Sequence, residues 1–104
     1  MAVSREVKES PLRQGTDEQI AYTLTTTPWG STPTSVAVAA YDITSGTRTL
    51  VTSTVLSGAA SVSGDVITTP VVKSLTASSV YRLEILFTVS GNIEEAYLII
   101  NAEN

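Results

Sequence analysis

The sequence has no cysteine and no histidine among its 104 residues. Without cysteine there is no disulfide bond and no thiolate metal site, and without histidine the commonest zinc ligand and general base are missing. A nucleophilic serine would then need a lysine as its base, and the only lysines, Lys8 and Lys73, lie in no recognisable motif. The composition therefore predicts a non-enzymatic protein without a zinc centre.

Charged side chains are also few. Six basic and ten acidic residues give a formal net charge of -4, which opposes attraction to nucleic acid or to an anionic membrane. No apolar run approaches the roughly 20 residues that a membrane helix needs, and residues 1–10 carry mixed charges where a secretion signal would be apolar. We expect no nucleic-acid partner, no membrane partner, and synthesis in the cytoplasm without processing.

The acidic residues are poorly placed for chemistry. Glu94 and Glu95 are adjacent, so on a strand they point to opposite faces and do not converge on one substrate atom. Asp42, Asp65 and Asn92 are scattered along the chain, whereas a calcium site needs several oxygens from one loop. We predict no catalytic residue, no metal site and no cofactor.

Threonine, serine and valine dominate the sequence and suit strands better than helices. From 75 to 100, alternate apolar residues share one side of an extended chain that turns at Ser90-Gly91-Asn92, while Glu84 faces the other side as a solvent-side or cross-strand charge partner. The stretch 35–43 is apolar on both faces, which predicts a central strand covered on both sides. Strands are expected at 18–26, 35–43, 48–55, 65–72, 81–90 and 93–101, with a further short strand at 60–62.

Leu75 precedes Tyr81 by six residues, and Tyr81 opens the long strand. This is the spacing of a tyrosine corner, in which the phenol hydroxyl bonds back to backbone at the corner between two strands of a β-sandwich. Turn signals recur roughly every 8 to 12 residues, as in such sandwiches. The sequence therefore predicts an all-β protein, an immunoglobulin-like or fibronectin III-like β-sandwich of about seven antiparallel strands.

The chain divides into two parts by composition. Residues 1–17 are crowded with charges and turn signals and are expected to form an extended N-terminal arm, whereas residues 18–104 are expected to form the sandwich. Free termini fray unless something holds them, so the arm is expected to pack on the domain's own sheet or on a neighbouring subunit.

Trp29 lies in a proline- and glycine-rich break between two strands. We favour a core lid whose indole N–H bonds a backbone carbonyl, and the alternative is an exposed contact anchor. The candidate subunit interface combines the arm and this loop: Val3, Arg5, Val7, Lys8, Arg13 and Trp29.

Four features carry a family resemblance: the acidic, tyrosine-containing run 17–24, the Trp29 segment, the short glycine- and serine-rich middle, and 75–81 with its paired final strands. They resemble the small immunoglobulin-like modules of tailed-bacteriophage virions, particularly the fibre-to-tail adaptor proteins of the neck and tail. The resemblance runs from about Arg13 to Asn101. Fibronectin type III modules share the leucine-to-tyrosine spacing but normally have proline where this chain has Ala77.

The resemblance implies a non-enzymatic virion protein, assembled in the host bacterial cytoplasm. It would link neck, tail or fibre components by contacts with other virion proteins and with copies of itself, through edge strands or an arm laid beside a neighbour's sheet. A capsid decoration protein is one alternative. Another is a fibronectin-like accessory, spacer or glycan-binding module of a bacterial surface or secreted protein.

Overall fold

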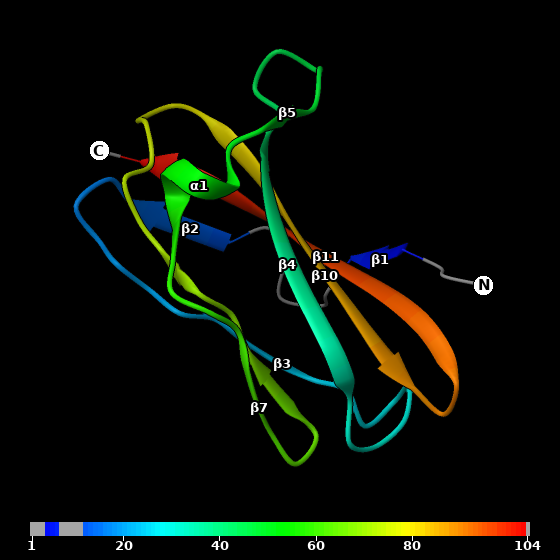
Figure 1. The fold of residues 1–104 in the computed structure, drawn as a ribbon. Helices are drawn as coiled ribbons and strands as arrows, with labels where there is room; N and C mark the ends of the chain where they lie inside the picture. The colour runs from blue at the N-terminus through cyan, green and yellow to red at the C-terminus, as the bar shows by residue number, and fades with distance from the viewer. Residues whose placement is uncertain (1–3, 7–11, 104) are drawn as a thin grey trace.

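The computed structural model describes residues 4–6 and 12–103, and most of them lie in strands (Figure 1). The described residues contain one short helix, α1 (Thr52–Val55). The prediction of an all-β protein is therefore confirmed. The strands are β1 (Ser4–Glu6), β2 (Leu12–Gly15), β3 (Thr23–Thr25), β4 (Thr34–Asp42), β5 (Thr49–Leu50), β6 (Leu56–Ser57), β7 (Ser61–Ser63), β8 (Val66–Thr68), β9 (Val71–Val72), β10 (Val80–Val89) and β11 (Asn92–Glu103).

β10 is the central strand of the larger sheet. It pairs antiparallel with β11 along its whole length and with β4 on its other side, and β5 pairs with the far edge of β4. At the opposite edge β1 and β2 both pair with β11, and both run parallel to it. The prediction of antiparallel strands alone is therefore wrong, because the arm lies along the last strand in the same direction.

The β10–β11 hairpin closes through Ser90 and Gly91, whose φ angles are 50° and 80°. Positive φ at both central positions characterises a type I′ turn, and its twist matches that of the strands it joins. Glycine adopts such angles without strain, which suits it to the second position. The turn fixes the register in which alternate residues of both strands enter the core.

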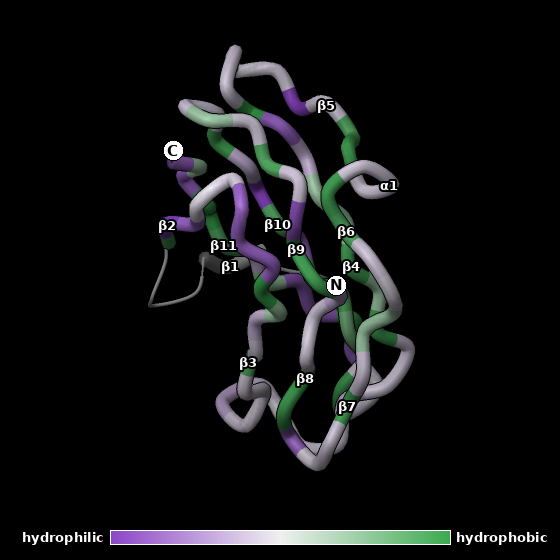
Figure 2. The backbone as a smooth tube through the Cα atoms, turned by 90° about the vertical axis from the view of Figure 1, so that its left-hand side faces the viewer, coloured by the Kyte–Doolittle hydropathy of each residue, from purple (hydrophilic) through white to green (hydrophobic). Residues whose placement is uncertain are grey.

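A second layer of short strands faces the larger sheet. β3, β8 and β7 pair antiparallel in that order, and β6 pairs with β9. An isolated bridge from Ile20 to Val72 links the segment before β3 to β9. Figure 2 shows β3, β8 and β7 side by side in the lower half of the molecule.

The hydrophobic core lies between the two layers. Ile85 and Phe87 of β10 pack with Leu24 of β3 and Ile67 of β8, and all four are buried. Burial of a side chain of this size contributes about 1.5–3 kcal/mol, so this contact between layers contributes substantially to stability. A second cluster surrounds Tyr81: Ala40, Val55, Val72, Leu75, Leu83, Leu98, Ile100 and Ala102.

The Tyr81 hydroxyl bonds to backbone upstream of its strand. It accepts a hydrogen bond of 2.9 Å from the N–H of Thr76, and Leu75 lies beside it in the same cluster. The spacing of Leu75 and Tyr81 predicts such a bond, and the backbone is its donor. The bond ties the loop before β10 to the start of the central strand.

The helix α1 replaces the second half of the strand predicted at 48–55. The N–H of Ala40 donates to the hydroxyl of Thr52 at 3.0 Å, so a side chain takes the place of the next backbone partner and strand pairing ends. The N–H of Val55 then bonds to the carbonyl of Val51. Valine and threonine are weak helix formers, so the sequence gives no local sign of this turn.

β4 is also less covered than its sequence predicts. Ala40 is buried on the inner face, which faces the core, but Ala37 is exposed on the outer face. Alanine is small enough to fit either environment, so an apolar run rich in alanine does not distinguish them. The strand predicted at 35–43 therefore lies next to the sheet edge with one open face.

Gln14 of β2 is a fully buried polar side chain, 0 % exposed, that joins the two layers. Its Nε2 donates to the carbonyls of Val72 at 2.7 Å and Glu18 at 3.0 Å, and its Oε1 accepts from the Tyr22 hydroxyl at 2.6 Å. Both amide hydrogens and the amide oxygen therefore have partners, as burial of an amide requires. Residues 12–15 of the predicted arm are part of the packed domain.

We predict that Gln14→Leu lowers the free energy of unfolding by about 1–3 kcal/mol, because it leaves the Tyr22 hydroxyl without its acceptor in a partly buried place. Urea unfolding followed by Trp29 fluorescence measures the change. Gln19→Leu at an exposed position is the control and should change the free energy by less than about 0.5 kcal/mol. Equal losses in the two variants would contradict the bridging role of Gln14.

The Tyr22 phenol should make stability depend on alkaline pH. Burial raises the pKa of Tyr22 above its ordinary 10.0, and the charge of Glu18 raises it further. The unfolded phenol loses its proton first, so the stability that this group provides is complete below pH 10.0 and is lost as pH rises through the folded pKa. Urea titrations from about pH 8 to about pH 11 should show a steeper fall for the wild type than for Tyr22→Phe. If the free energies of unfolding of the wild type and Tyr22→Phe fall with pH in parallel, the predicted role of the Tyr22 phenol is wrong.

Candidate interaction surface

Among the residues predicted to form a subunit interface, those that the structure describes do not gather on one surface. Val3, Val7 and Lys8 lie outside the described residues. Arg5 lies in β1 and Arg13 in β2, so the structure brings these two to the same edge of the larger sheet, beside β11. The tryptophan lies elsewhere, against the core.

Arg13 is the exposed member of this group. Its side chain is 77 % exposed, and Nη1 lies 3.7 Å from Oε2 of Glu103, whose side chain is also exposed. An exposed pair of this kind contributes about 0–1 kcal/mol. The Arg13 guanidinium is therefore weakly held and accessible.

The loop that carries Trp29 is anchored by Thr26, which is fully buried. The Thr26 N–H donates to the carbonyl of Asp65 at 2.7 Å, and its hydroxyl donates to the carbonyl of Gly30 at 3.1 Å. The Thr26 carbonyl in turn accepts from the N–H groups of Trp29 and Gly30. The Asp65 carboxylate accepts two more hydrogen bonds from the same loop. The loop is thus tied to the turn between β7 and β8.

Trp29 lies against the core. Its ring meets Phe87 edge to face, with centroids 5.6 Å apart and an interplanar angle of 74°. The next residue, Gly30, approaches so closely that an added Cβ would lie 3.1 Å from Cβ of Val89. The buried indole N–H has no hydrogen-bond partner among the described residues. Trp29 therefore has the position of a core lid, but the prediction of a carbonyl partner is wrong.

The outer face of the larger sheet brings together charged and aromatic side chains that the sequence does not connect. Strand register places Tyr41 of β4, Arg82 and Glu84 of β10, and Glu95 and Tyr97 of β11 on this face. Glu84 is 5 % exposed even though it points away from the core. We call these five residues, together with an arginine from the loop before β5, the charged outer face.

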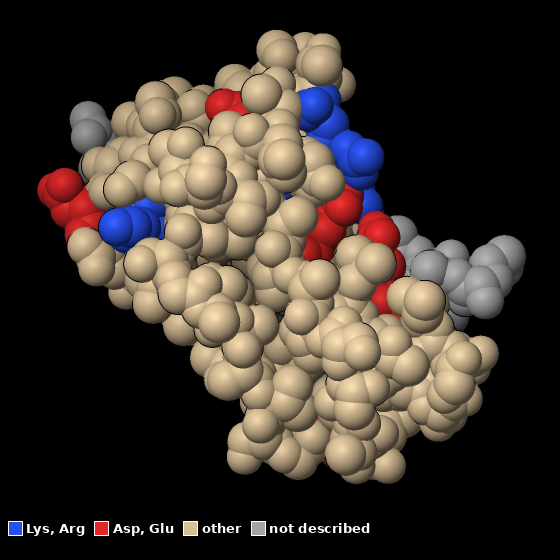
Figure 3. Space-filling view, in the orientation of Figure 1, with Lys and Arg blue, Asp and Glu red and all other residues tan. Residues whose placement is uncertain are grey.

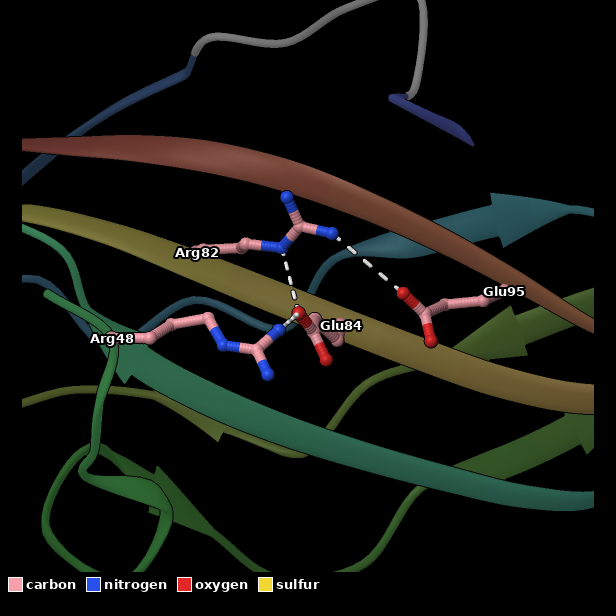
Figure 4. Close-up of polar contacts among 4 residues, drawn as sticks. All are labelled: Arg48, Arg82, Glu84 and Glu95. Atoms are coloured by element: carbon pink, nitrogen blue, oxygen red, sulfur yellow. Dashed lines mark hydrogen bonds and ion pairs between the residues drawn. The ribbon is translucent and has the colours of Figure 1, made fainter. Parts of the chain in front are cut away.

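Figure 4 shows how two arginines enclose Glu84. Arg48 Nη1 and Arg82 Nε each lie 2.7 Å from Glu84 Oε2, and Arg82 Nη2 lies 3.6 Å from Oε2 of Glu95. Hydrogen bonds between ionised partners at this distance are roughly twice as strong as neutral ones. The Arg48 side chain is 56 % exposed and that of Arg82 is 22 % exposed, so the network is solvated mainly on the Arg48 side.

The same arginines cover two tyrosine rings. The guanidinium carbon of Arg82 lies 3.7 Å from the ring centroid of Tyr97, and that of Arg48 lies 4.6 Å from the ring centroid of Tyr41. Cation–π contacts of this kind add about 0.5–1 kcal/mol each at exposed sites. Each arginine is therefore fixed by a carboxylate and by a ring, which gives the charged outer face a defined pattern of charge.

Charge is unevenly distributed over the surface. Figure 3 shows acidic and basic atoms together at the left and at the right of the molecule, with a separate acidic group near the top, while the lower half of the visible face has almost none. The sequence explains this pattern, because 19–41 and 49–64 contain no charged residue. β3, β7 and β8 carry serine, threonine and apolar residues only.

The described residues offer little for metal or acid–base chemistry. In residues 4–6 and 12–103, no group of three or more acidic side chains is close enough to hold a metal ion. Glu84 is enclosed by arginines, so its carboxylate does not face an open cleft. In the same part of the chain, no helix is long and apolar enough to cross a membrane. Comparison with protein-family models, curated proteins and solved structures found no match.

Sequence reasoning found part of the charged outer face. It assigned Glu84 as a solvent-side or cross-strand charge partner. Glu84 does form ion pairs on the face away from the core, but it is buried, and its partners lie in a loop and on its own strand. Arg82 and Glu84 are two residues apart on a strand, so their shared face is visible in the sequence. Arg48 comes from a loop 36 residues away in sequence, and strand register alone brings it to Glu84.

We predict that Glu84→Gln lowers the free energy of unfolding by about 1–3 kcal/mol, because two guanidinium groups lose an anionic acceptor in a place with little water. Chemical denaturation at low and high salt measures this loss, which should persist at high salt because burial limits screening.

Glu103→Gln is the matched control, since Glu103 forms an exposed pair with Arg13. It should cost less than about 1 kcal/mol, and that cost should vanish at high salt. If both variants lose the same free energy of unfolding with the same salt dependence, the Glu84 network contributes no more to stability than an exposed ion pair does.

Proposed function

We propose that this chain is a non-enzymatic structural component of a tailed-phage virion, an immunoglobulin-like module that links neck, tail or fibre components. The strand order supports the immunoglobulin-like part of this proposal, and the virion role rests on the sequence resemblance. β3, β8 and β7 follow the order of the second, fifth and fourth strands of an immunoglobulin domain, and β11, β10 and β4 follow that of the seventh, sixth and third. The departure is the arm, which pairs in parallel with the last strand.

The segments that carry the virion resemblance occupy key places in this arrangement. The run 17–24 leads from the Gln14 bridge into β3, and Trp29 closes the core above Phe87. Leu75 and Tyr81 sit where the chain enters β10. Their common role is to hold the two layers together, which supports a module that works through shape and contact.

The surface also favours contact over catalysis. The charged outer face presents fixed arginine and carboxylate groups, and the second layer is free of charge on its described strands. Two surfaces of such different character suit a protein that meets more than one neighbour. The partners proposed are other virion proteins and copies of this chain, met in a particle assembled in the host bacterial cytoplasm.

The aromatic residues argue against the glycan-binding alternative. Sugar rings stack on open aromatic faces, but Trp29 meets Phe87 in the core and the rings of Tyr41 and Tyr97 are covered by arginines. The capsid decoration alternative would use the same contacts at a different place on the particle. Locating the chain by electron microscopy of labelled particles distinguishes decoration from neck, tail or fibre attachment.

We predict that purified particles of the phage that encodes this chain contain it in a fixed copy number. Quantitative mass spectrometry through successive density-gradient bandings measures the amount, which should stay constant relative to the major capsid protein. A host cytoplasmic protein serves as the control and should decline with each banding. Presence of the chain in infected cells and its loss from banded particles would overturn the proposal.

The role of the arm is tested on the same particles. Deletion of residues 1–11 keeps Gln14 and its bridge, so the domain should fold and unfold with a cooperative transition. If the arm makes the contact with a neighbour, this variant is absent from the particles although it is soluble in the cell. Normal incorporation of the folded variant would exclude the arm as the strap.

A further inference from the structure

The outer edge of β4 is open along most of its length. Among the described residues, β5 pairs only with Tyr41 and Asp42. Ala40 is the last position with partners on this side: its N–H donates to the Thr52 hydroxyl, and its carbonyl accepts from Val51 at 2.9 Å. The stretch of β4 before Ala40 thus has backbone groups facing away from the sheet.

Strand alternation shows which groups these are. In an antiparallel sheet, both backbone groups of every second residue point to the same side. Because both groups of Ala40 point away from β10, both groups of Val38 do so as well, and so does the carbonyl of Val36. Ser35, with a φ of 53°, and a shift of register at this point end the regular edge.

The opposite side of the same sheet ends in two short strands. β1 pairs with Glu95 to Tyr97 of β11, and β2 pairs with Ile100 to Glu103. Short edge strands limit pairing with another chain, so the longer run of β4 before Ala40 is the stronger candidate for a partner strand.

We propose that the open edge of β4 pairs with the same edge of a second copy of this chain, in an antiparallel, two-fold symmetric dimer. The N–H of Val38 donates to the carbonyl of Val36 in the partner, and the reciprocal bond forms by symmetry. In this register Ala37 lies opposite its own copy. If the two-fold axis passed through Val38 instead, Tyr41 and Asp42 of one copy would lie opposite the start of β4 in the other. The β5 strand that pairs with these two residues would then collide with the start of β4.

A second copy fits this edge better than a charged peptide does. From 33 to 41 the chain has no charged residue, and the side chains on the outer face near the axis are the methyl groups of Ala37 and Ala39. The edge is also complementary to itself, because the N–H of Val38 and the carbonyl of Val36 both face away from β10, and a two-fold axis at Ala37 brings each donor to the acceptor of the other copy. This inference rests on the proposed role of the chain as a contact module.

Cysteine crosslinking tests the register directly, because the wild-type chain has no cysteine. Across an antiparallel pair without backbone bonds the Cα atoms are about 4.5 Å apart, within the range that a disulfide spans. Purified Ala37→Cys should therefore form a covalent dimer under mild oxidation, roughly tenfold or more faster than Ser53→Cys, which measures random collision at an exposed site.

Ala39→Cys is the control for register. It lies on the same face, but in the proposed register the two copies are four residues apart along the strands, about 13 Å, and should not crosslink. An Ala37→Cys rate equal to that of Ser53→Cys, or faster crosslinking of Ala39→Cys, would overturn the proposal.

Dimer formation can also be measured without introducing cysteine. Sedimentation velocity of the wild type should show a dimer that Ala37→Lys converts to a monomer, because two ammonium groups would meet at the axis. A wild type that stays monomeric at high concentration overturns the edge pairing. That failure leaves the virion assignment standing, since particle content is measured separately.

Discussion

The hydrogen bonds of Gln14 are the constraint on which the architecture depends. Parallel pairing of β2 with the end of β11 brings this amide inside, where an unpaired group would cost about 1–3 kcal/mol. Val72 of β9 and two residues of the segment between β2 and β3, Glu18 and Tyr22, supply the missing partners. The amide therefore fixes the position of β2 against both layers at once, and β2 in turn pairs with the end of β11.

The central strand β10 presents one face to the core and the other to the charged outer face. Tyr81 and Arg82 are neighbours in sequence, yet Tyr81 holds the loop before the strand and Arg82 bonds Glu84 on the opposite face. The strand alternation that fills the core thus places the charged outer face as well. A slip of one residue would exchange the two faces, so the register of the β10–β11 hairpin matters equally to both.

Local patterns predicted the β10–β11 hairpin well, but the strand predicted at 18–26 is reduced to Thr23–Thr25. The alternation from 81 to 101 and the turn at Ser90 and Gly91 define the hairpin, because both signals lie within neighbouring residues. The parallel pairing of β2 had no such signal, and Gln14 beside Gly15 suggested a turn. The position of Arg48 over Glu84 was equally hidden, since it depends on how distant strands align. Residues whose partners are far away in sequence are the ones that pattern reasoning missed.

Glu84 is a buried carboxylate on the face of the sheet that points to solvent. Removing its charge from water costs several kcal/mol, and its two arginine partners largely offset that cost. The network therefore adds less stability than apolar residues of similar size would, and its main effect is to fix the positions of the charged groups. Arg82 is held by two carboxylates and a ring, whereas Arg48 keeps more than half of its side chain exposed. A partner that approaches this face meets charges that are already paired and desolvates mainly Arg48, so selectivity here depends more on the position of Arg48 than on the total charge.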